Sequence, residues 1–165
     1  SSIDEIEKIC ISEAGKVLKN DQYTILKDRK KLIIFEEKSI SNNIFYIKSK
    51  DDVLNLPFLM NISEVETEEF NTDKRTIFVN SNLLKWPLVL RRKKTGDYFQ
   101  PFGMNGIKKV SKFFKDEKLS KIQKDNTWIL ENGDGKIIWI VGLRADDRFK
   151  ITSNNQKNYK ITLNQ

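Results

Sequence analysis

Basic side chains gather in one stretch of the sequence, and their spacing suits contact with a row of phosphates. Residues 88–124 hold 11 Lys and Arg against 3 Asp and Glu, whereas residues 1–85 hold 13 against 15. A local excess of this kind attracts polyanions whatever their sequence. Nucleic acids and anionic membrane surfaces both fit that description, so the charge predicts a class of partner.

Two basic runs in this stretch are separated by glycines. The first run is Arg91, Arg92, Lys93 and Lys94, and the second is Lys108, Lys109, Lys112, Lys115 and Lys118. Gly96, Gly103 and Gly106 lie between them. Each glycine alone is best explained as a turn residue with positive φ. A turn without Cβ atoms also lets backbone amides and nearby lysines approach phosphates closely, which gives the three glycines an indirect functional role.

Other residues of this half of the chain have simpler interpretations. Asp97 is expected to cap local amides or to pair with Arg91 or Arg92. Asp146 and Asp147 lie between Arg144 and Arg148 and are expected to form a charge-balanced loop, although both arginines remain candidates for contact with a nucleic acid. Aromatic side chains could stack on bases, but beside apolar helix and strand positions they are usually core. We therefore predict a buried position for Phe99, Phe102, Phe113, Phe114, Trp128 and Trp139.

Composition excludes several kinds of chemistry. The chain has no histidine and a single cysteine, Cys10, so the usual zinc ligands and histidine-based catalysis are missing. No two glycines are adjacent, and no Gly-Lys-Ser/Thr motif for nucleotide phosphates is present. We expect no cofactor or metal in this chain. Without a signal peptide or a long apolar run, the expected location is the cytoplasm.

Apolar periodicity predicts an α+β chain. Residues 3–10 repeat apolar side chains at helical spacing, so a short amphipathic helix should begin the chain and end at Gly15. Short β-branched runs then predict strands of an antiparallel, sandwich-like sheet. These runs are residues 23–26, 32–35, 44–47, 58–65, 76–79 and 88–91.

Two short helices are expected after the glycine-rich turn. Residues 108–118 carry a buried stripe of Val110, Phe113 and Phe114. Ser120 and Gln123 form a Ser-x-x-Gln capping box, which predicts a second helix of about two turns. A hairpin across residues 132–135 should join strands 128–130 and 136–141. Closing strands are expected at 149–151 and 159–163, with a surface loop at 152–157.

The order R-x-x-x-G-D-x-F-x-P-x-G-M-x-G-x-K-K-x-S-x-F-F-x-D-x-K, from Arg92 to Lys118, resembles the C-terminal domain of bacterial tRNA(Ile)-lysidine synthetases. The likeness continues to residue 151, so the motif core is 86–151. It implies a helical lead-in over residues 1–20 and a tRNA-binding domain over 21–165. Asn80-Ser81-Asn82 stands where the family leads us to expect an acidic residue.

The resemblance also implies a function. Such enzymes use ATP, with Mg, to adenylate the wobble cytidine of tRNA-Ile and then attach lysine, which changes decoding from AUG to AUA. Their ATP-binding domain carries a Ser-Gly-Gly-x-Asp-Ser loop that this chain lacks, so the chain alone should be inactive. Its expected partners are the acceptor stem of tRNA-Ile and the catalytic domain of the same enzyme. No membrane contact is expected, and the sequence is compatible with a homodimer. A free-standing RNA-binding module and a protein-interaction domain are the alternatives.

Overall fold

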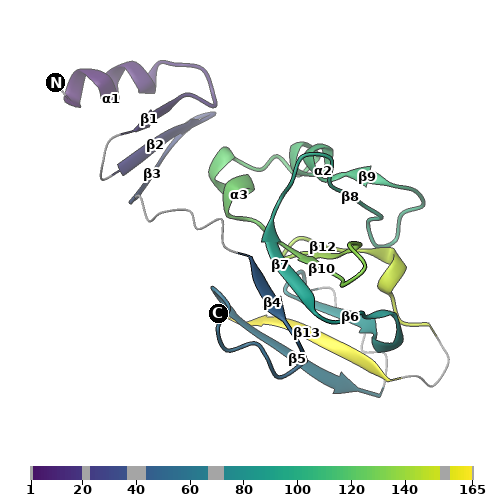
Figure 1. Cartoon of the computed structure of the whole chain (residues 1–165). Helices are drawn as coiled ribbons and strands as arrows, with labels where there is room; N and C mark the ends of the chain where they lie inside the picture. Colours follow the sequence, from purple (N-terminus) through teal and green to yellow (C-terminus); the bar gives the residue numbers. More distant parts are fainter. Residues whose placement is uncertain (1, 20–22, 37–43, 67–72, 153–156, 165) are drawn as a thin grey trace. The chain divides into compact units, whose positions relative to one another are not determined.

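The computed structural model describes residues 2–19, 23–36, 44–66, 73–152 and 157–164. The chain divides into two compact units (Figure 1). The smaller unit combines residues 1–41 with 114–126, and the larger unit combines residues 42–113 with 127–165. The domain boundary predicted at residue 20 falls between β1 (Val17–Lys19) and β2 (Tyr23–Asp28), two strands of the smaller unit that pair antiparallel.

The smaller unit begins with the predicted amphipathic helix, α1 (Ser2–Cys10), which buries Ile9. Strands β1, β2 and β3 (Lys31–Glu36) form an antiparallel sheet in sequence order. The helix ends at Cys10, before the predicted end at Gly15. Gly15 instead lies in the turn leading to β1, with a φ of +93°, and its amide donates to the Lys27 carbonyl at 2.7 Å.

Two antiparallel sheets make up the core of the larger unit. The first has the order β12-β11-β10-β7-β4 and the second β5-β13-β6. Their bounds are β4 (Phe45–Ile47), β5 (Leu59–Val65), β6 (Thr76–Asn80), β7 (Leu88–Arg92), β10 (Trp128–Glu131), β11 (Ile137–Ile140), β12 (Arg144–Ala145) and β13 (Asn158–Asn164). Buried residues from both sheets, such as Leu90, Trp139 and Ile161, form one hydrophobic cluster. The predicted α+β, sandwich-like fold is therefore confirmed, as are the core positions of both tryptophans.

The segment between β7 and β10 contains the two predicted helices, with a change at its start. Lys108–Lys109 forms a short strand, β9, paired with β8 (Tyr98–Phe99), and the helix α2 covers only Val110–Asp116. The second helix, α3 (Lys121–Asn126), follows the capping box. The box is formed in both directions: the Ser120 amide donates to the Gln123 side chain at 2.9 Å, and the Gln123 amide donates to the Ser120 hydroxyl at 3.2 Å.

Other differences from the expected elements are local. Residues 149–151 do not form a strand, because Asp147–Phe149 is a 3-10 helix, η2, begun by an Asp146 side chain that accepts from the Arg148 amide. Asn80 begins η1 (Ser81–Leu83) in the same manner, by accepting from the Asn82 amide. An asparagine thus supplies a cap at the point where an acidic residue was expected. Most of the predicted loop at 152–157 lies outside the described residues.

The turn between β10 and β11 is fixed to the chain just before β7. The buried Asn132 side chain accepts from the Lys85 amide at 2.7 Å and donates to the Leu83 carbonyl at 3.2 Å. The Gly133 amide donates to the Lys85 carbonyl at 2.7 Å. A Cβ at Gly133 would collide with that carbonyl, so this turn needs glycine for space.

Candidate nucleic-acid interface

Arg91, at the end of β7, was a candidate for RNA contact, but the structure places it inside the larger unit. Its side chain is only 4% exposed. Its guanidinium donates to both carboxylate oxygens of Asp97, at 2.8 and 3.0 Å, and to Glu131 at 2.5 Å. Burial alone would lower the pKa of Arg91, yet hydrogen bonds and charges from these two carboxylates outweigh burial and raise it. Arg91 is thus an internal ion-pair residue, and the predicted RNA contact does not fit this geometry.

Asp97 links this buried arginine to the turn of residues 94–97, which we call the basic turn. Its carboxylate also accepts from the Lys94 amide at 2.7 Å, which confirms the expected capping and pairing. Its backbone amide donates to the Lys94 carbonyl at 3.2 Å, and its own carbonyl accepts from the Val110 amide at 2.9 Å. Tyr98 then pairs with Lys109 across β8 and β9. Asp97 therefore brings the first basic run beside the start of α2.

Arg92 lies directly opposite Trp128 in the pairing of β7 with β10. Its guanidinium carbon lies 3.6 Å from the centre of the Trp128 ring, a cation–π contact. Directly opposite residues of an antiparallel pair share a face, which explains the contact. The half-buried Arg92 thus covers one edge of the core, and an additional contact with RNA stays a prediction.

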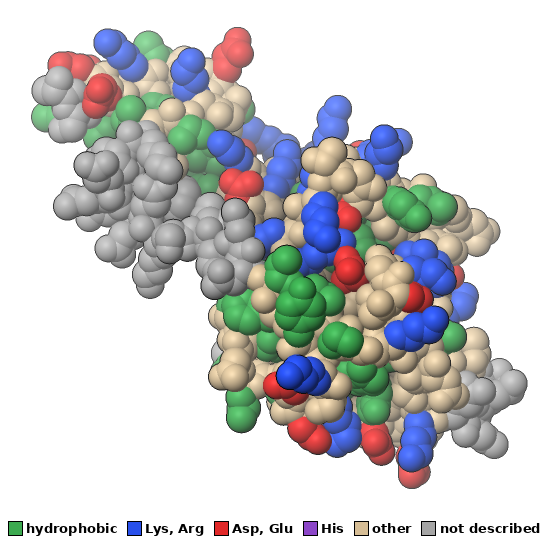
Figure 2. Space-filling view, in the orientation of Figure 1, with side chains coloured by type: hydrophobic (Ala, Val, Ile, Leu, Met, Phe, Trp, Pro, Cys, Tyr) green, Lys and Arg blue, Asp and Glu red, His purple; other side chains and the backbone are tan. Residues whose placement is uncertain are grey.

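The remaining cations of the two basic runs are lysines. Their side chains are exposed at Lys93, Lys94, Lys109, Lys112, Lys115 and Lys118, and half-buried at Lys108. The Lys108 ammonium lies 5.8 Å from the centre of the Phe113 ring. We call Lys93, Lys94, Lys108, Lys109 and Lys112 the basic ridge. Figure 2 shows blue side chains among green and tan surface over the part of the larger unit where Figure 1 places β8 and β9.

The three predicted turn glycines all have positive φ: +87° at Gly96, +80° at Gly103 and +100° at Gly106. A Cβ at any of them would meet no atom within 4 Å. Backbone conformation, not crowding, is therefore what requires glycine here, as expected. Their proximity to a phosphate stays a prediction.

Arg144 and Arg148 hold loops together. The Arg144 guanidinium donates twice to the Phe102 carbonyl, at 3.2 and 2.6 Å. Arg148 donates to both oxygens of Asp146, whose side chain is fully buried, at 3.0 and 2.8 Å. The hydrogen bonds to Asp146 raise the pKa of Arg148. The loop is charge-balanced, as the sequence predicted, while RNA contact by either arginine stays untested by this geometry.

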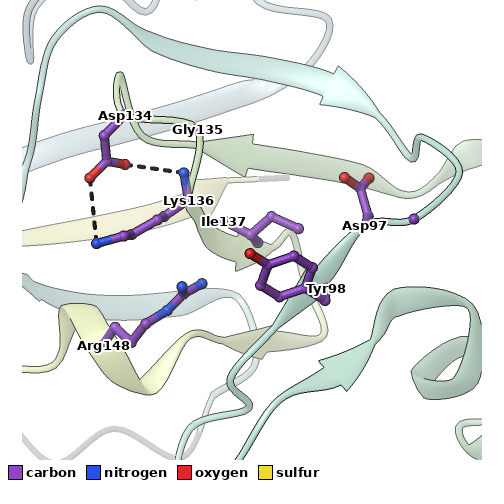
Figure 3. Close-up of a pocket in the computed structure, with 8 residues that line it drawn as sticks. Asp97, Tyr98, Asp134, Gly135, Lys136, Ile137 and Arg148 are labelled. Atoms are coloured by element: carbon purple, nitrogen blue, oxygen red, sulfur yellow. Dashed lines mark hydrogen bonds and ion pairs between the residues drawn. The ribbon is translucent and has the colours of Figure 1, made fainter.

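An open pocket of about 290 Å³ lies between the basic turn and the β10–β11 turn. Arg148 and Tyr98 project into it beside the pair formed by Asp134 and Lys136 (Figure 3). Burial tends to raise the pKa of Asp134, but hydrogen bonds from Lys136 and Asn132 and the charges of Lys136 and Lys85 lower it. Because Asp134 faces Lys136, and Arg148 is bound by Asp146, the charged groups around this pocket neutralise one another.

One aromatic prediction was wrong. Phe99, Phe113 and Phe114 are buried, and the rings of Phe99 and Phe113 meet edge to face with centres 5.1 Å apart. Phe102, however, is 51% exposed. It lies in the loop between β8 and β9, where no helix or strand periodicity directs its side chain toward the core.

The part of the chain that the structure describes contains no group of three or more Cys, Asp or Glu side chains arranged to hold a metal ion. Among the described helices, none is both long and apolar enough to cross a lipid bilayer.

Comparisons with known proteins agree with the motif. The model of the TilS substrate C-terminal domain matches residues 88–162. A tRNA(Ile)-lysidine synthase from Parabacteroides distasonis is 35% identical over 157 residues, 93% of this chain and 36% of that protein. One from Bacteroides thetaiotaomicron is 29% identical over 160 residues, 95% of this chain and 35% of that protein. The chain thus spans about a third of the length of these relatives.

The fold also has a solved counterpart. A crystal structure of a TilS C-terminal domain matches 73% of this chain and 95% of that chain, with a TM-score of 0.61 and 22% sequence identity. Motif, family model, relatives and fold point the same way: the chain belongs to the family of the C-terminal domain of tRNA(Ile)-lysidine synthase.

Proposed function

We propose that this chain is the tRNA-binding part of an ATP-dependent tRNA(Ile)-lysidine synthetase and that its basic ridge contacts the acceptor stem of tRNA-Ile. The observation that carries the proposal is the arrangement of the ridge around Asp97. Through Arg91, Asp97 is tied to the core, and through its backbone it joins the turn at Lys94 to the start of α2 at Val110. The exposed lysines therefore project from a fixed frame.

A-form RNA favours this kind of surface. Its deep major groove is closed to side chains, so proteins bind it mainly through phosphates, 2′-hydroxyls and shape. Lysines on a rigid turn and helix can meet phosphates without reading bases. Residues 98–113 include Lys108, Lys109 and Lys112 and no acidic residue, so a phosphate backbone would meet little repulsion along this segment.

The chemistry is proposed to reside in the rest of the enzyme. ATP with Mg would bind to the catalytic domain, where the wobble cytidine is adenylated and lysine then displaces AMP. In the cytoplasm, this chain would contribute by holding the tRNA so that the target cytidine reaches that site, which is catalysis by positioning. The 165 residues alone are expected to incorporate no lysine into tRNA.

Removing two ridge lysines tests the proposed RNA contact. Each phosphate contact contributes roughly 0.7–0.9 to the slope of log K against log salt. For the Lys109→Ala/Lys112→Ala double variant, we expect weaker binding of tRNA and a slope that is flatter by about 1.5. The measurement is fluorescence anisotropy of labelled tRNA at several salt concentrations. Different tRNAs should lose affinity to a similar extent, because phosphate contacts do not specify sequence.

The matched control is Lys48→Ala/Lys74→Ala, which removes two exposed lysines outside residues 88–124 of the larger unit. This variant should keep the slope of the unmodified chain. Equal slopes for both double variants and the unmodified chain would reject the ridge as an RNA contact. An acidic protein that binds the chain and is not displaced by tRNA would support the protein-interaction alternative instead.

A further inference from the structure

Beside the basic ridge, the loop of residues 101–107 presents apolar side chains to solvent. Phe102 is 51% exposed, Met104 45% and Ile107 70%. We call residues 101–107 the apolar loop. Three exposed large apolar side chains within six residues are unusual for a surface segment without a partner, since contiguous exposed apolar surface commonly marks an interaction site.

The apolar loop is held rigidly from the protein side. Arg144 donates twice to the Phe102 carbonyl, and the Phe102 amide donates to the Ala145 carbonyl at 2.9 Å. The Gly103 amide donates to the Asp147 carboxylate at 3.1 Å. The Phe102 backbone thus uses both its amide and its carbonyl internally, while the ring faces outward. A contact surface held in this way loses little conformational entropy on binding.

Charge around the apolar loop favours an anionic partner. Lys108 and Lys109 follow it directly, and no acidic residue occurs between Asp97 and Asp116. The carboxylates behind the loop are occupied: Asp147 bonds Gly103 and lies 3.2 Å from the Lys150 ammonium, and Asp146 is bound by Arg148. A partner would therefore meet an aromatic ring beside positive charge, which is the combination used to bind nucleobases with their phosphates.

We propose that Phe102 stacks on the exposed face of a nucleobase at the end of an RNA helix, while the basic ridge contacts the adjoining phosphates. The inference rests on the proposed RNA binding and adds a contact of different chemistry to it. Bases inside a duplex are covered by their neighbours on both faces, so only a terminal pair, or an unpaired base stacked on it at an open end, offers a face to the ring. The apolar loop would thus locate the end of the acceptor stem.

The test compares two RNAs that differ only in their ends. One is a duplex with a free end, and the other has the same duplex closed by a hairpin loop at each end. Phe102→Ala should weaken binding of the open-ended RNA at least about five-fold, the low end of the range for one base stacked on an aromatic ring. It should leave binding of the closed RNA and the salt slope unchanged, because no phosphate contact is lost. Phe102→Trp should retain the preference for the free end.

A terminal 2-aminopurine in the open RNA gives a second readout, since stacking on Phe102 should quench its fluorescence and Phe102→Ala should abolish the quenching. Leu54→Ala is the matched control, because Leu54 is 92% exposed in the same unit and lies outside the apolar loop. Equal binding of both RNAs by the unmodified chain, with a steep salt slope, would overturn the stacking proposal alone. Failure to bind either RNA would overturn it together with the proposed function.

Two other outcomes would assign the apolar loop to a different partner. Binding to anionic phosphatidylserine vesicles that Phe102→Ala abolishes, without an effect on RNA, would identify a membrane contact. A dimer in sedimentation experiments that Phe102→Ala dissociates would identify a contact between copies of this chain. Either result would reject the nucleobase proposal.

Discussion

Arginines and lysines of the larger unit differ in the groups that they contact. Arg91, Arg144 and Arg148 bind carboxylates or a carbonyl of the protein itself, and we call them the inner layer. The basic ridge forms an outer layer of mostly exposed lysines. A planar guanidinium makes two parallel hydrogen bonds and suits fixed internal pairs, whereas an ammonium on a flexible stem stays hydrated. Charge in the sequence predicts a surface that attracts polyanions. Residue type then distinguishes the arginines that form internal pairs from the lysines that remain exposed.

Arg91→Ala should give the largest loss of stability among the variants that test these two layers. Arg91→Ala would leave Asp97 and Glu131, only 11% and 16% exposed, without their common cation. Losing one partner of a buried ion pair costs about 3–5 kcal/mol, so we expect that loss in the free energy of unfolding. Urea denaturation followed by tryptophan fluorescence measures it. Lys93→Ala is the control and should stay within about 0.5 kcal/mol of the unmodified chain. Equal effects of both variants would remove the distinction between the layers.

Asp146→Ala removes the partner of Arg148, another arginine of the inner layer, and should have a smaller effect than Arg91→Ala. The Asp146 carboxylate accepts from Arg148 and also from the Gln100 amide at 2.9 Å. Asp146→Ala should lower the free energy of unfolding by about 2–3 kcal/mol, since hydrogen bonds to a charged group are lost. The control is Asp51→Ala, because Asp51 is 81% exposed and its surface pair with Lys50 should contribute little. A stable Asp146→Ala protein would mean that this loop does not depend on its buried carboxylate.

Asp134 offers the smallest effect, through pH. Its folded-state pKa is lowered, so its contribution to stability is present above the unfolded-state pKa of about 3.9 and is lost as the pH falls through the folded value. Asp134→Asn should therefore make stability depend less on pH between neutral and acid conditions. Thermal unfolding of both proteins at several pH values checks this. An identical pH profile would show that Asp134 contributes nothing to acid sensitivity.

Much of the fold could be predicted because periodicity and capping are local signals. The strand run from Thr76 to Val79 and the Ser120 capping box need only neighbouring residues to be recognised. Two-residue strands give no such signal, so Lys108 and Lys109 were assigned to the helix that begins at Val110. The stripe of apolar residues shows that a helix is present, but not where it starts.

The candidate surface was harder to predict, because the partners of its charged side chains lie far apart in the sequence. Arg91 resembles its basic neighbours in the sequence, but β10 places Glu131 on the same face, two residues along from Ile129, which lies directly opposite Arg91. Strand alternation offered a partial signal, since Arg91 and Arg92 must point to opposite faces of the sheet. Phe102 lacked even that signal, because its exposure depends on the hydrogen bonds that Arg144 and Ala145 make with its backbone.

The direct pairing of β7 with β10 has a consequence for how this family can vary. Residues 93–127 leave the sheet at Arg92 and return at Trp128, its cross-strand neighbour, so they form an insertion between two paired strands, with its own short strands and helices joined by loops. Each doubling of loop length costs only about 0.6 kcal/mol of closure entropy. Insertions, deletions and charge changes within these loops can therefore accumulate while the register of the sheet stays the same, as long as the tie from Arg91 to Asp97 is kept. Related proteins could in this way vary the charge of the basic ridge while keeping the sheet that supports it.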